Sequence, residues 1–341
     1  MVHVAKLVGV FNTAHGPFCY IPSELWNAER AKRLLRSDVP FDDDEENRRK
    51  AERINRGFAV LRDKLAAAKP DVIVIYGNDQ REIFDFSNYP MLSVMACPEF
   101  HGAILDNASR AYGSEAEERV TYKGDPRFGA QLILGLNQRG FDPSFSLDMP
   151  ATGHGMPHAV SNPMRSLTDL SIPIVPIMLN CYYTPQITGR RSYEIGRAIG
   201  EIIASDRSER RVAVIGSGGL WHTPGERFTY IDEAFDRTMI ERMCAGDAQG
   251  MAAHFDGYRI PLDDESQQLA PRGWRSEALR AAGFESTGLP APGGPQGGTR
   301  ETCCWIAAAA AAEGRTGTLV DYVPVYSSPI GLGFAYWDIA A

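Results

Sequence analysis

The sequence predicts an α/β fold in one domain, with a central, mostly parallel or mixed sheet flanked by helices and a functional site in the loops at strand ends. Short apolar, β-branched runs alternate with segments of helical periodicity along the chain. The 341 residues are 44% hydrophobic and 23% charged, which allows a sizeable core without extensive disorder. No internal repeat or strong boundary divides the chain, so residues 1–341 are expected to form a single domain.

The first half of the chain contains two predicted strands. Residues 4–11 form an apolar run that ends before His15, and the Gly-Pro pair after His15 can neither continue a strand nor begin a helix at once. Residues 71–76 form the second strand, which ends in a polar segment that contains Gln80 and Arg81. We therefore expect these polar side chains on loops at strand ends.

One helix is predicted before the second strand in the sequence and another after it. Apolar residues recur at helical spacing from 54 to 65, after an acidic run at 42–46 that favours a helix N-terminus. Residues 127–139 also have a helical pattern. The region from about 87 to 150 otherwise indicates loops and short strands that cover a site.

The second half continues the alternation of strands and helices. Residues 152–158 form a glycine-containing loop with His154, and residues 172–179 form a strand whose prolines at 173 and 176 indicate an edge position or a bulge. The remaining predicted elements are helices at 191–204, from 231 and at 299–312, and strands at 212–215 and 318–326. Glu301 lies near the N-terminus of the helix at 299–312, where an acidic residue also compensates the helix dipole.

The chain is organised around the strand at 212–215 and the loop that follows it, GSGGLWH at 216–222. Three glycines within four residues allow the backbone to turn tightly, because glycine accepts positive φ at low cost. Trp221 stands where a dinucleotide-binding G-x-G-x-x-G motif needs glycine. Ile215 stands where a G-x-S-x-G nucleophile elbow needs glycine. Both motifs are therefore excluded, and His222 is either a functional residue or a structural one on a tight turn.

Composition excludes several classes of partner. The formal net charge of −8 argues against broad binding of nucleic acid or anionic membranes, and no apolar run approaches the roughly 18 residues of a membrane span. The N-terminus lacks the pattern of a signal peptide, and six scattered cysteines without a C-x-x-C spacing indicate reduced thiols. We expect a cytoplasmic protein, with a homodimer as the commonest oligomer.

Three histidines and a carboxylate fall on the predicted loops and helix start. His15, His154 and His222 follow strands or glycine turns, and Glu301 is presented by a Pro/Gly-rich lead-in. Two histidines and one carboxylate are the ligand set of non-haem Fe(II) oxygenases, with open positions for substrate and O₂. Zinc accepts similar ligands, so ligand type leaves the metal open. Taken singly, each histidine is equally consistent with a structural role.

Five segments resemble the class III extradiol ring-cleavage dioxygenases of the protocatechuate 4,5-dioxygenase catalytic-subunit type. They lie at 9–17, 70–80, 153–155, 216–222 and 301–306, in the order of that family. The Gly-Gly-x-x-His segment after a strand is the most specific. The chain length and the Asp-Gln form of the second segment look most like the single-chain branch that includes 3-O-methylgallate dioxygenases.

This resemblance implies a role for each matching residue. His15 matches the first iron-binding histidine, Glu301 the iron-binding glutamate, His222 the catalytic acid/base, and His154 a histidine near the substrate. Gln80 stands where the best-known members have their second iron-binding histidine, and an amide oxygen is a weaker donor to iron. Either Gln80 binds weakly, or Asp79, Glu82 or another histidine replaces it, or the site has lost iron.

The resulting hypothesis is a single catalytic domain with Fe(II) as cofactor that cleaves the ring of a catecholic, carboxylated or methoxylated aromatic with O₂. Tyr20, Arg81 and Ser327 are predicted to contact the substrate. One alternative is an iron-free or differently catalytic member of the same fold with a binding or regulatory role, which the glutamine at position 80 motivates. A second alternative is a zinc hydrolase, which would be indifferent to O₂.

Overall fold

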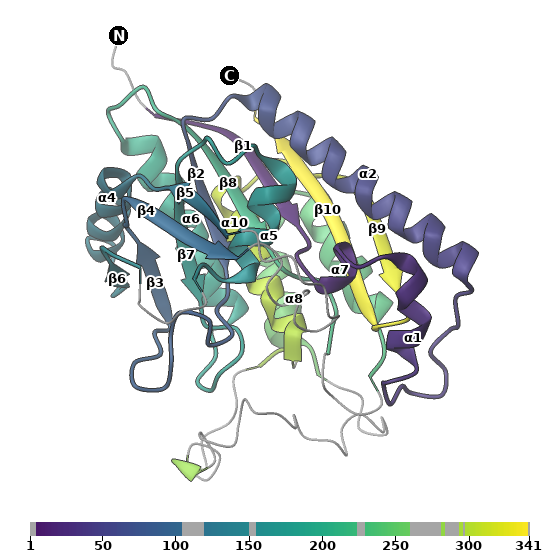
Figure 1. Ribbon diagram of the computed structural model, residues 1–341. Coiled ribbons are helices and arrows are strands. Elements are labelled where there is room, and N and C mark those ends of the chain that lie inside the picture. The colour runs from purple at the N-terminus through teal and green to yellow at the C-terminus, as the bar shows by residue number, and fades with distance from the viewer. Residues whose placement is uncertain are drawn as a thin grey trace.

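The structure is a computed structural model that describes residues 5–103, 119–149, 155–223, 229–259, 281–283, 293–295 and 297–339. Its centre is a mixed sheet of eight strands in the order β6-β3-β7-β2-β8-β1-β10-β9 (Figure 1). These strands are β1 (Lys6–Thr13), β2 (Val72–Gly77), β3 (Leu92–Met95), β6 (Ser144–Ser146), β7 (Ile174–Leu179), β8 (Arg211–Ser217), β9 (Thr318–Val325) and β10 (Ile330–Asp338). The predicted α/β class and mixed sheet are confirmed.

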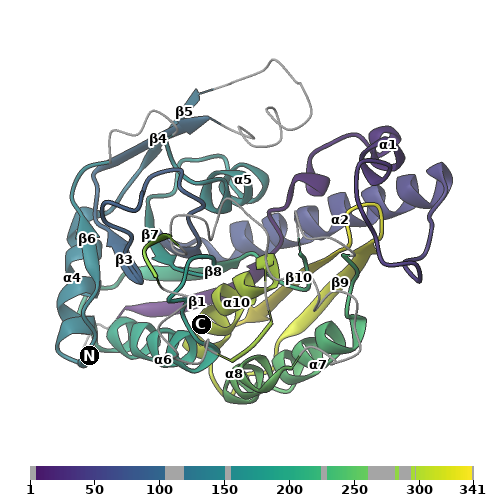
Figure 2. The ribbon, with the colours of Figure 1, turned by 90° about the horizontal axis from the view of Figure 1, so that it is seen from below.

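Helices cover both faces of this sheet (Figure 2). One face carries α2 (Asp44–Ala68) and α5 (His158–Leu167). The opposite face carries α4 (Pro126–Asn137), α6 (Gly189–Ser205), α7 (Glu233–Cys244) and α10 (Thr302–Ala311), and α8 (Ala248–Gly257) packs on α6 and α10. The short helix α1 (Trp26–Arg30), three 3₁₀ turns (Pro17–Cys19, Ser23–Leu25 and Gly297–Glu301) and a hairpin of β4 (Glu99–Ala103) and β5 (Arg119–Lys123) complete the described elements.

The central strands are apolar on both sides because both faces of the sheet are buried. In β2, Val72, Val74 and Tyr76 belong to the core beneath α4, α6 and α10, whereas Ile73 and Ile75 belong to the core beneath α2 and α5. Successive side chains of a strand point to opposite faces, so a strand buried on both faces needs a continuous apolar run. This explains why the runs at 71–76 and 212–215 lack polar alternation.

Two strands differ from the sequence-based expectations. The prediction that the prolines place residues 172–179 at an edge or a bulge is wrong, because β7 lies between β2 and β3 with a regular register. Pairing with β3 covers only 177–179, so Pro176 sits where just one side of the strand is paired. The sequence reading also missed β10, which lies antiparallel between β1 and β9.

The alanine-rich helix α10 packs unusually close to α6. A Cβ at Gly196 would lie 2.0 Å from the carbonyl oxygen of Ala307, so this crossing requires glycine on one helix and small side chains on the other. All residues of α10 up to Ala310 are buried. The helix is thereby held against the sheet, and its N-terminus, where Glu301 lies, is fixed near the strand ends. Within the described part of the chain, no helix is long and apolar enough to cross a membrane.

Candidate active site

The carboxyl ends of four adjacent parallel strands define the candidate site. β7, β2, β8 and β1 are neighbours in the sheet and run parallel, so the loops that follow them meet at one edge. Ligands bind at this edge in open α/β sheets. His15 follows β1, Gln80 follows β2, Tyr182 follows β7 and His222 follows β8.

His15 and Glu301 form a buried pair at the centre of this edge. His15 Nε2 lies 3.3 Å from Glu301 Oε2, and each residue is only 2% exposed. The other ring nitrogen of His15, Nδ1, lies 2.9 Å from the Ser217 hydroxyl at the end of β8. The Asn162 amide donates to the His15 carbonyl oxygen at 3.3 Å. These contacts fix both the backbone and the ring, and they direct Nε2 at the carboxylate.

The Glu301 carboxylate has further polar partners. The Tyr182 hydroxyl donates to Oε1 at 2.6 Å, and the Gln80 amide nitrogen lies 3.4 Å from the same oxygen. Burial by itself raises the pKa of Glu301, but the charge and hydrogen bond of His15, the charge of His222 and the Tyr182 hydroxyl lower it to about 2. The carboxylate is therefore ionised at neutral pH although it is buried.

His222 is held at the edge of the pair by the 3₁₀ turn before α10. Its backbone N–H donates to Thr299 Oγ1 at 2.8 Å, and the Thr299 N–H donates to the His222 carbonyl oxygen at 2.7 Å. A Cβ at Gly298 would lie 2.0–2.5 Å from atoms of the His222 ring, so the imidazole rests directly on glycine backbone. The residue is half-buried, which leaves the ring accessible to a small molecule.

The glycines between β8 and His222 are explained by the approach of Glu301. Gly218 has φ +132°, and a Cβ there would lie 2.7 Å from Glu301 Cβ. Gly219 has φ +34° and packs on Thr302. A side chain at either position would strain the backbone and displace the start of α10. The glycine-rich loop thus brings the ends of β8 and α10 into contact.

The structure adds site residues that the sequence reading missed. His158 begins α5, its Nδ1 lies 2.8 Å from Glu82 Oε1, and its ring centre is 4.9 Å from that of His15. Tyr182 could have been found by the strand-end rule, because it follows the predicted strand at 172–179. His158 belongs to the glycine-containing loop that the sequence singled out for His154. His154 itself lies outside the described residues.

The three predicted substrate contacts lie on separate loops. The Tyr20 hydroxyl is 3.4 Å from Ser166 Oγ. The exposed Arg81 guanidinium lies 5.1 Å from the centre of the Phe86 ring. Ser327 is buried in the turn between β9 and β10, with Oγ 3.5 Å from an Asn27 oxygen. Their part in substrate binding stays a prediction.

The donor chemistry of the central pair fits a metal ion. An imidazole nitrogen and an ionised carboxylate oxygen are ligands that Fe(II) and Zn(II) both accept. Across the described residues, no group of three or more His, Cys, Asp or Glu side chains is already arranged around a single metal position. His15 and Glu301 offer two donors of this kind, side by side.

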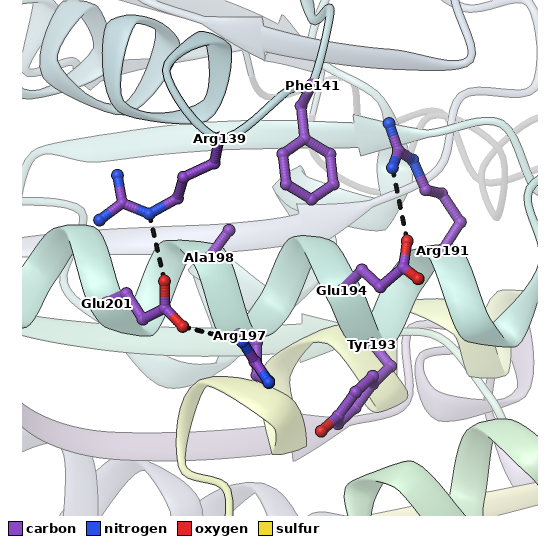
Figure 3. A pocket seen from close by; sticks show the side chains of 8 residues that line it. All are labelled: Arg139, Phe141, Arg191, Tyr193, Glu194, Arg197, Ala198 and Glu201. Atoms are coloured by element: carbon purple, nitrogen blue, oxygen red, sulfur yellow. Dashed lines mark hydrogen bonds and ion pairs between the residues drawn. The ribbon is translucent and has the colours of Figure 1, made fainter.

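A separate pocket lies on the outer side of α6 (Figure 3). It has a volume of about 540 Å³ and is lined by Arg139, Phe141, Arg191, Tyr193, Glu194, Arg197, Ala198 and Glu201. Its arginines pair with Glu194 and Glu201, so opposite charges largely neutralise each other there. It includes no residue of the strand-end site.

The fold and the strand-end site define an α/β protein with a buried histidine–carboxylate centre and an accessible histidine beside it. Residues 39–256 match the family described as the catalytic LigB subunit of aromatic ring-opening dioxygenase, and the chain belongs to this family. It is thus an extradiol aromatic-ring-cleaving dioxygenase, as its sequence segments predicted. The matched residues include Gln80, His158 and His222, whereas His15 and Glu301 lie outside them.

Two relatives carry the name 2,3-dihydroxyphenylpropionate/2,3-dihydroxicinnamic acid 1,2-dioxygenase. The protein of Mycobacterium sp. (strain MCS) is 26% identical over 277 residues, which cover 76% of this chain and 81% of the relative. The protein of Photorhabdus laumondii subsp. laumondii is 25% identical over 277 residues, which cover 76% of this chain and 80% of the relative.

Proposed function

We propose that this dioxygenase depends on non-haem Fe(II) and uses O₂ to cleave a catecholic ring next to its two hydroxyl groups. The observation that carries the proposal is the buried His15–Glu301 pair, with the half-buried His222 beside it. His15 and Glu301 would hold the metal. When bound, Fe(II) would supply a template that holds the catechol and O₂ together for reaction.

The surroundings of the pair suit this task. Tyr182 fixes one oxygen of Glu301 by hydrogen bonding, and Ser217 fixes the His15 ring through Nδ1. Both ligands are thus held in place before the metal binds, and their burial keeps water away from the reacting atoms. The low pKa of Glu301 keeps it an anionic ligand over the whole neutral range.

We assign the proton transfers of the reaction to His222. A catechol hydroxyl must lose a proton when the substrate binds, and a proton must be returned as the ring is opened. An imidazole, whose unperturbed pKa is near neutrality, serves as base and then as acid. The hydrogen bonds to Thr299 and the contact with Gly298 hold His222 for both transfers. His154, as the family resemblance implies, would assist near the substrate.

The names of the relatives and the resemblance of the sequence segments support a choice of ring substituents for the substrate. The two relatives are named for catechols with a carboxylated side chain, and the sequence segments resemble enzymes for methoxylated catechols. We propose a carboxylated or methoxylated catechol, with Arg81 as the cation that meets a substrate carboxylate. Tyr20 and Ser327 complete the proposed substrate contacts.

Oxygen uptake tests the proposed function. Protein purified without O₂ and loaded with Fe(II) is mixed with unsubstituted catechol, 2,3-dihydroxyphenylpropionate and 3-O-methylgallate. The expected result is O₂ consumption together with the yellow absorbance of a ring-opened product from at least one carboxylated substrate. Zinc-loaded protein is the matched control and should consume none. Tight catechol binding without O₂ uptake would instead support the iron-free binding protein.

A further inference from the structure

The proposed metal site has one imidazole, that of His15. His15 and Glu301 are in place, but position 80 carries an amide where the resemblance implies a histidine. An amide oxygen is a weaker donor to Fe(II) than an imidazole nitrogen. We propose that His158 supplies the second imidazole and that Gln80 orients Glu301 instead of binding the metal. This inference rests on the proposed function only in that the site holds a metal.

The position of the His158 ring suits a ligand that shares an ion with His15. The two ring centres are 4.9 Å apart, and the rings are inclined at 85°. With metal–nitrogen bonds of about 2.1 Å, two imidazoles on adjacent positions of one ion have ring centres roughly 4.5–5 Å apart. His158 therefore lies beside one of the two residues that we propose as ligands.

Glu82 prepares His158 for metal binding. Its Oε1 accepts a hydrogen bond from the His158 backbone N–H at 3.1 Å and lies 2.8 Å from the ring Nδ1. A carboxylate at Nδ1 places the ring proton there, so Nε2 carries the lone pair that a metal uses. The side chains are 7% and 14% exposed, which keeps water from competing for this contact. A carboxylate–histidine pair of this kind is the usual support of a metal-binding imidazole.

The loop that carries Glu82 is itself rigid. The Asp79 carboxylate accepts backbone N–H bonds from the four residues at 81–84, at 3.0–3.3 Å. This arrangement fixes the backbone from which both Gln80 and Glu82 project. Gln80 Nε2 is directed at Glu301 Oε1, so its amide offers a donor and not an acceptor to the centre of the site. Among the described residues no three donors converge on one point, so the assignment includes a shift of the His158 ring toward His15 and Glu301 on metal binding, with Nδ1 kept at Glu82.

Metal titration and a count of bound imidazoles test the assignment without substrate or O₂. Apo protein is titrated with Fe(II) alone under anaerobic conditions. One equivalent of Cu(II) then serves as a spin probe, and pulsed electron paramagnetic resonance counts the histidines bound to it. The key variant is His158→Asn, whose amide retains a donor near the Nδ1 position toward Glu82 but lacks Nε2. Gln80→Ala is its matched control on the neighbouring element.

The wild type is expected to show two imidazoles. His158→Asn should show one and bind Fe(II) at least 10-fold more weakly. Gln80→Ala should keep two imidazoles and lose affinity less than His158→Asn. Glu82→Gln should weaken Fe(II) binding by about 10–100-fold, as loss of a hydrogen-bonding partner of a ligand does. Adding Gln80→His to His158→Asn should restore the second imidazole, which also shows that the variant is folded.

One imidazole in the wild type, or an unchanged count and affinity in His158→Asn, would overturn the assignment. These results are separable from the proposed function. One imidazole together with O₂ uptake on a catechol removes His158 from the ligand set and leaves the dioxygenase proposal standing. Two imidazoles without O₂ uptake on any catechol would keep His158 as a ligand and contradict the proposed dioxygenase reaction.

Discussion

Two buried carboxyl groups contact the 216–222 loop, and their pKa values are shifted in opposite directions. Glu301 faces the strand-end site, and its pKa is lowered to about 2. Asp236, in α7, accepts hydrogen bonds at 2.7 Å from the Trp221 backbone N–H and from the Tyr322 hydroxyl. Burial raises the pKa of Asp236 to about 8. Both side chains are removed from solvent, so burial alone does not account for the difference.

The difference comes from the charges that each carboxyl faces. Burial raises the pKa of both groups, but Glu301 has His15 and His222 as neighbours that can carry positive charge. Asp236 has neutral donors and, nearby, the acidic Asp232 and Glu233, whose charges raise its pKa further. A buried anion is kept at Glu301 because it is compensated, and it can therefore serve a metal. Asp236 instead ties α7 to the loop and to β9 as a largely neutral group.

The largest expected effect separates the two carboxyls by function. Glu301→Ala should abolish measurable Fe(II) binding, and with it turnover, because the only carboxylate of the His15 pair is lost. Asp236→Ala should keep Fe(II) affinity but lower stability by about 2–4 kcal/mol, since it leaves the buried Trp221 N–H and the partly buried Tyr322 hydroxyl without their acceptor. Anaerobic Fe(II) titration and urea unfolding measure the two effects. Full Fe(II) occupancy in Glu301→Ala would reduce Glu301 to a helix-start acid.

The second expected effect is a loss of turnover when His222, next to Glu301, is replaced. His222→Gln should lower turnover by roughly 10²–10⁴-fold, the usual contribution of a general acid/base. Fe(II) and catechol binding should persist, because His222 is held by backbone contacts with Thr299 and does not lie in the His15–Glu301 pair. Steady-state O₂ uptake and anaerobic substrate binding measure this. Turnover equal to wild type would make His222 a structural loop residue.

Each of the two carboxyl groups accepts a hydrogen bond from its own tyrosine, and removal of that tyrosine hydroxyl should have a smaller effect. Tyr182→Phe removes the 2.6 Å hydrogen bond to Glu301 and should weaken Fe(II) binding by about 10-fold. Tyr322→Phe is the matched control: it removes the bond to Asp236 and should cost about 1 kcal/mol of stability without changing Fe(II) affinity. The comparison fails if both variants change Fe(II) affinity equally.

A further difference between the two carboxyl groups is expected in the pH dependence of stability. The pKa of Asp236 is raised from 3.8 to about 8, so the folded protein holds a proton that the unfolded chain releases. Stability should therefore fall as pH rises from about 4 to 8, by at most about 1.4 kcal/mol per pH unit. Asp236→Asn should remove this slope. The pKa of Glu301 is lowered, so its contribution is present above pH 4.5 and is lost only as pH falls toward 2. Urea unfolding at pH 5, 6.5 and 8 compares the wild type with Asp236→Asn.

Local patterns in the sequence predicted the central parallel strands, several helices and three members of the candidate site. The central strands were predictable because burial on both faces demands a continuous apolar run, and α2 because its buried residues recur at helical spacing. His15, Glu301 and His222 could be singled out because each follows a strand or begins a helix. Binding and catalytic residues are often found on such loops, which the rigid strands and helices hold in position. These signals need only residues that are neighbours along the chain.

Only the tertiary structure decided which residues meet. The central position of β7 and the position of β10 beside β1 depend on pairing between segments that are distant in the sequence. The hydrophobic pattern of a strand does not reveal its pairing partners. The contacts at Glu301 likewise join residues far apart in the sequence, since Gln80 and Glu301 are separated by 221 positions along the chain. The pairing of Glu82 with His158 crosses 76 positions. A single sequence records the identity of such residues but not their distance, because packing of the sheet and helices brings them together.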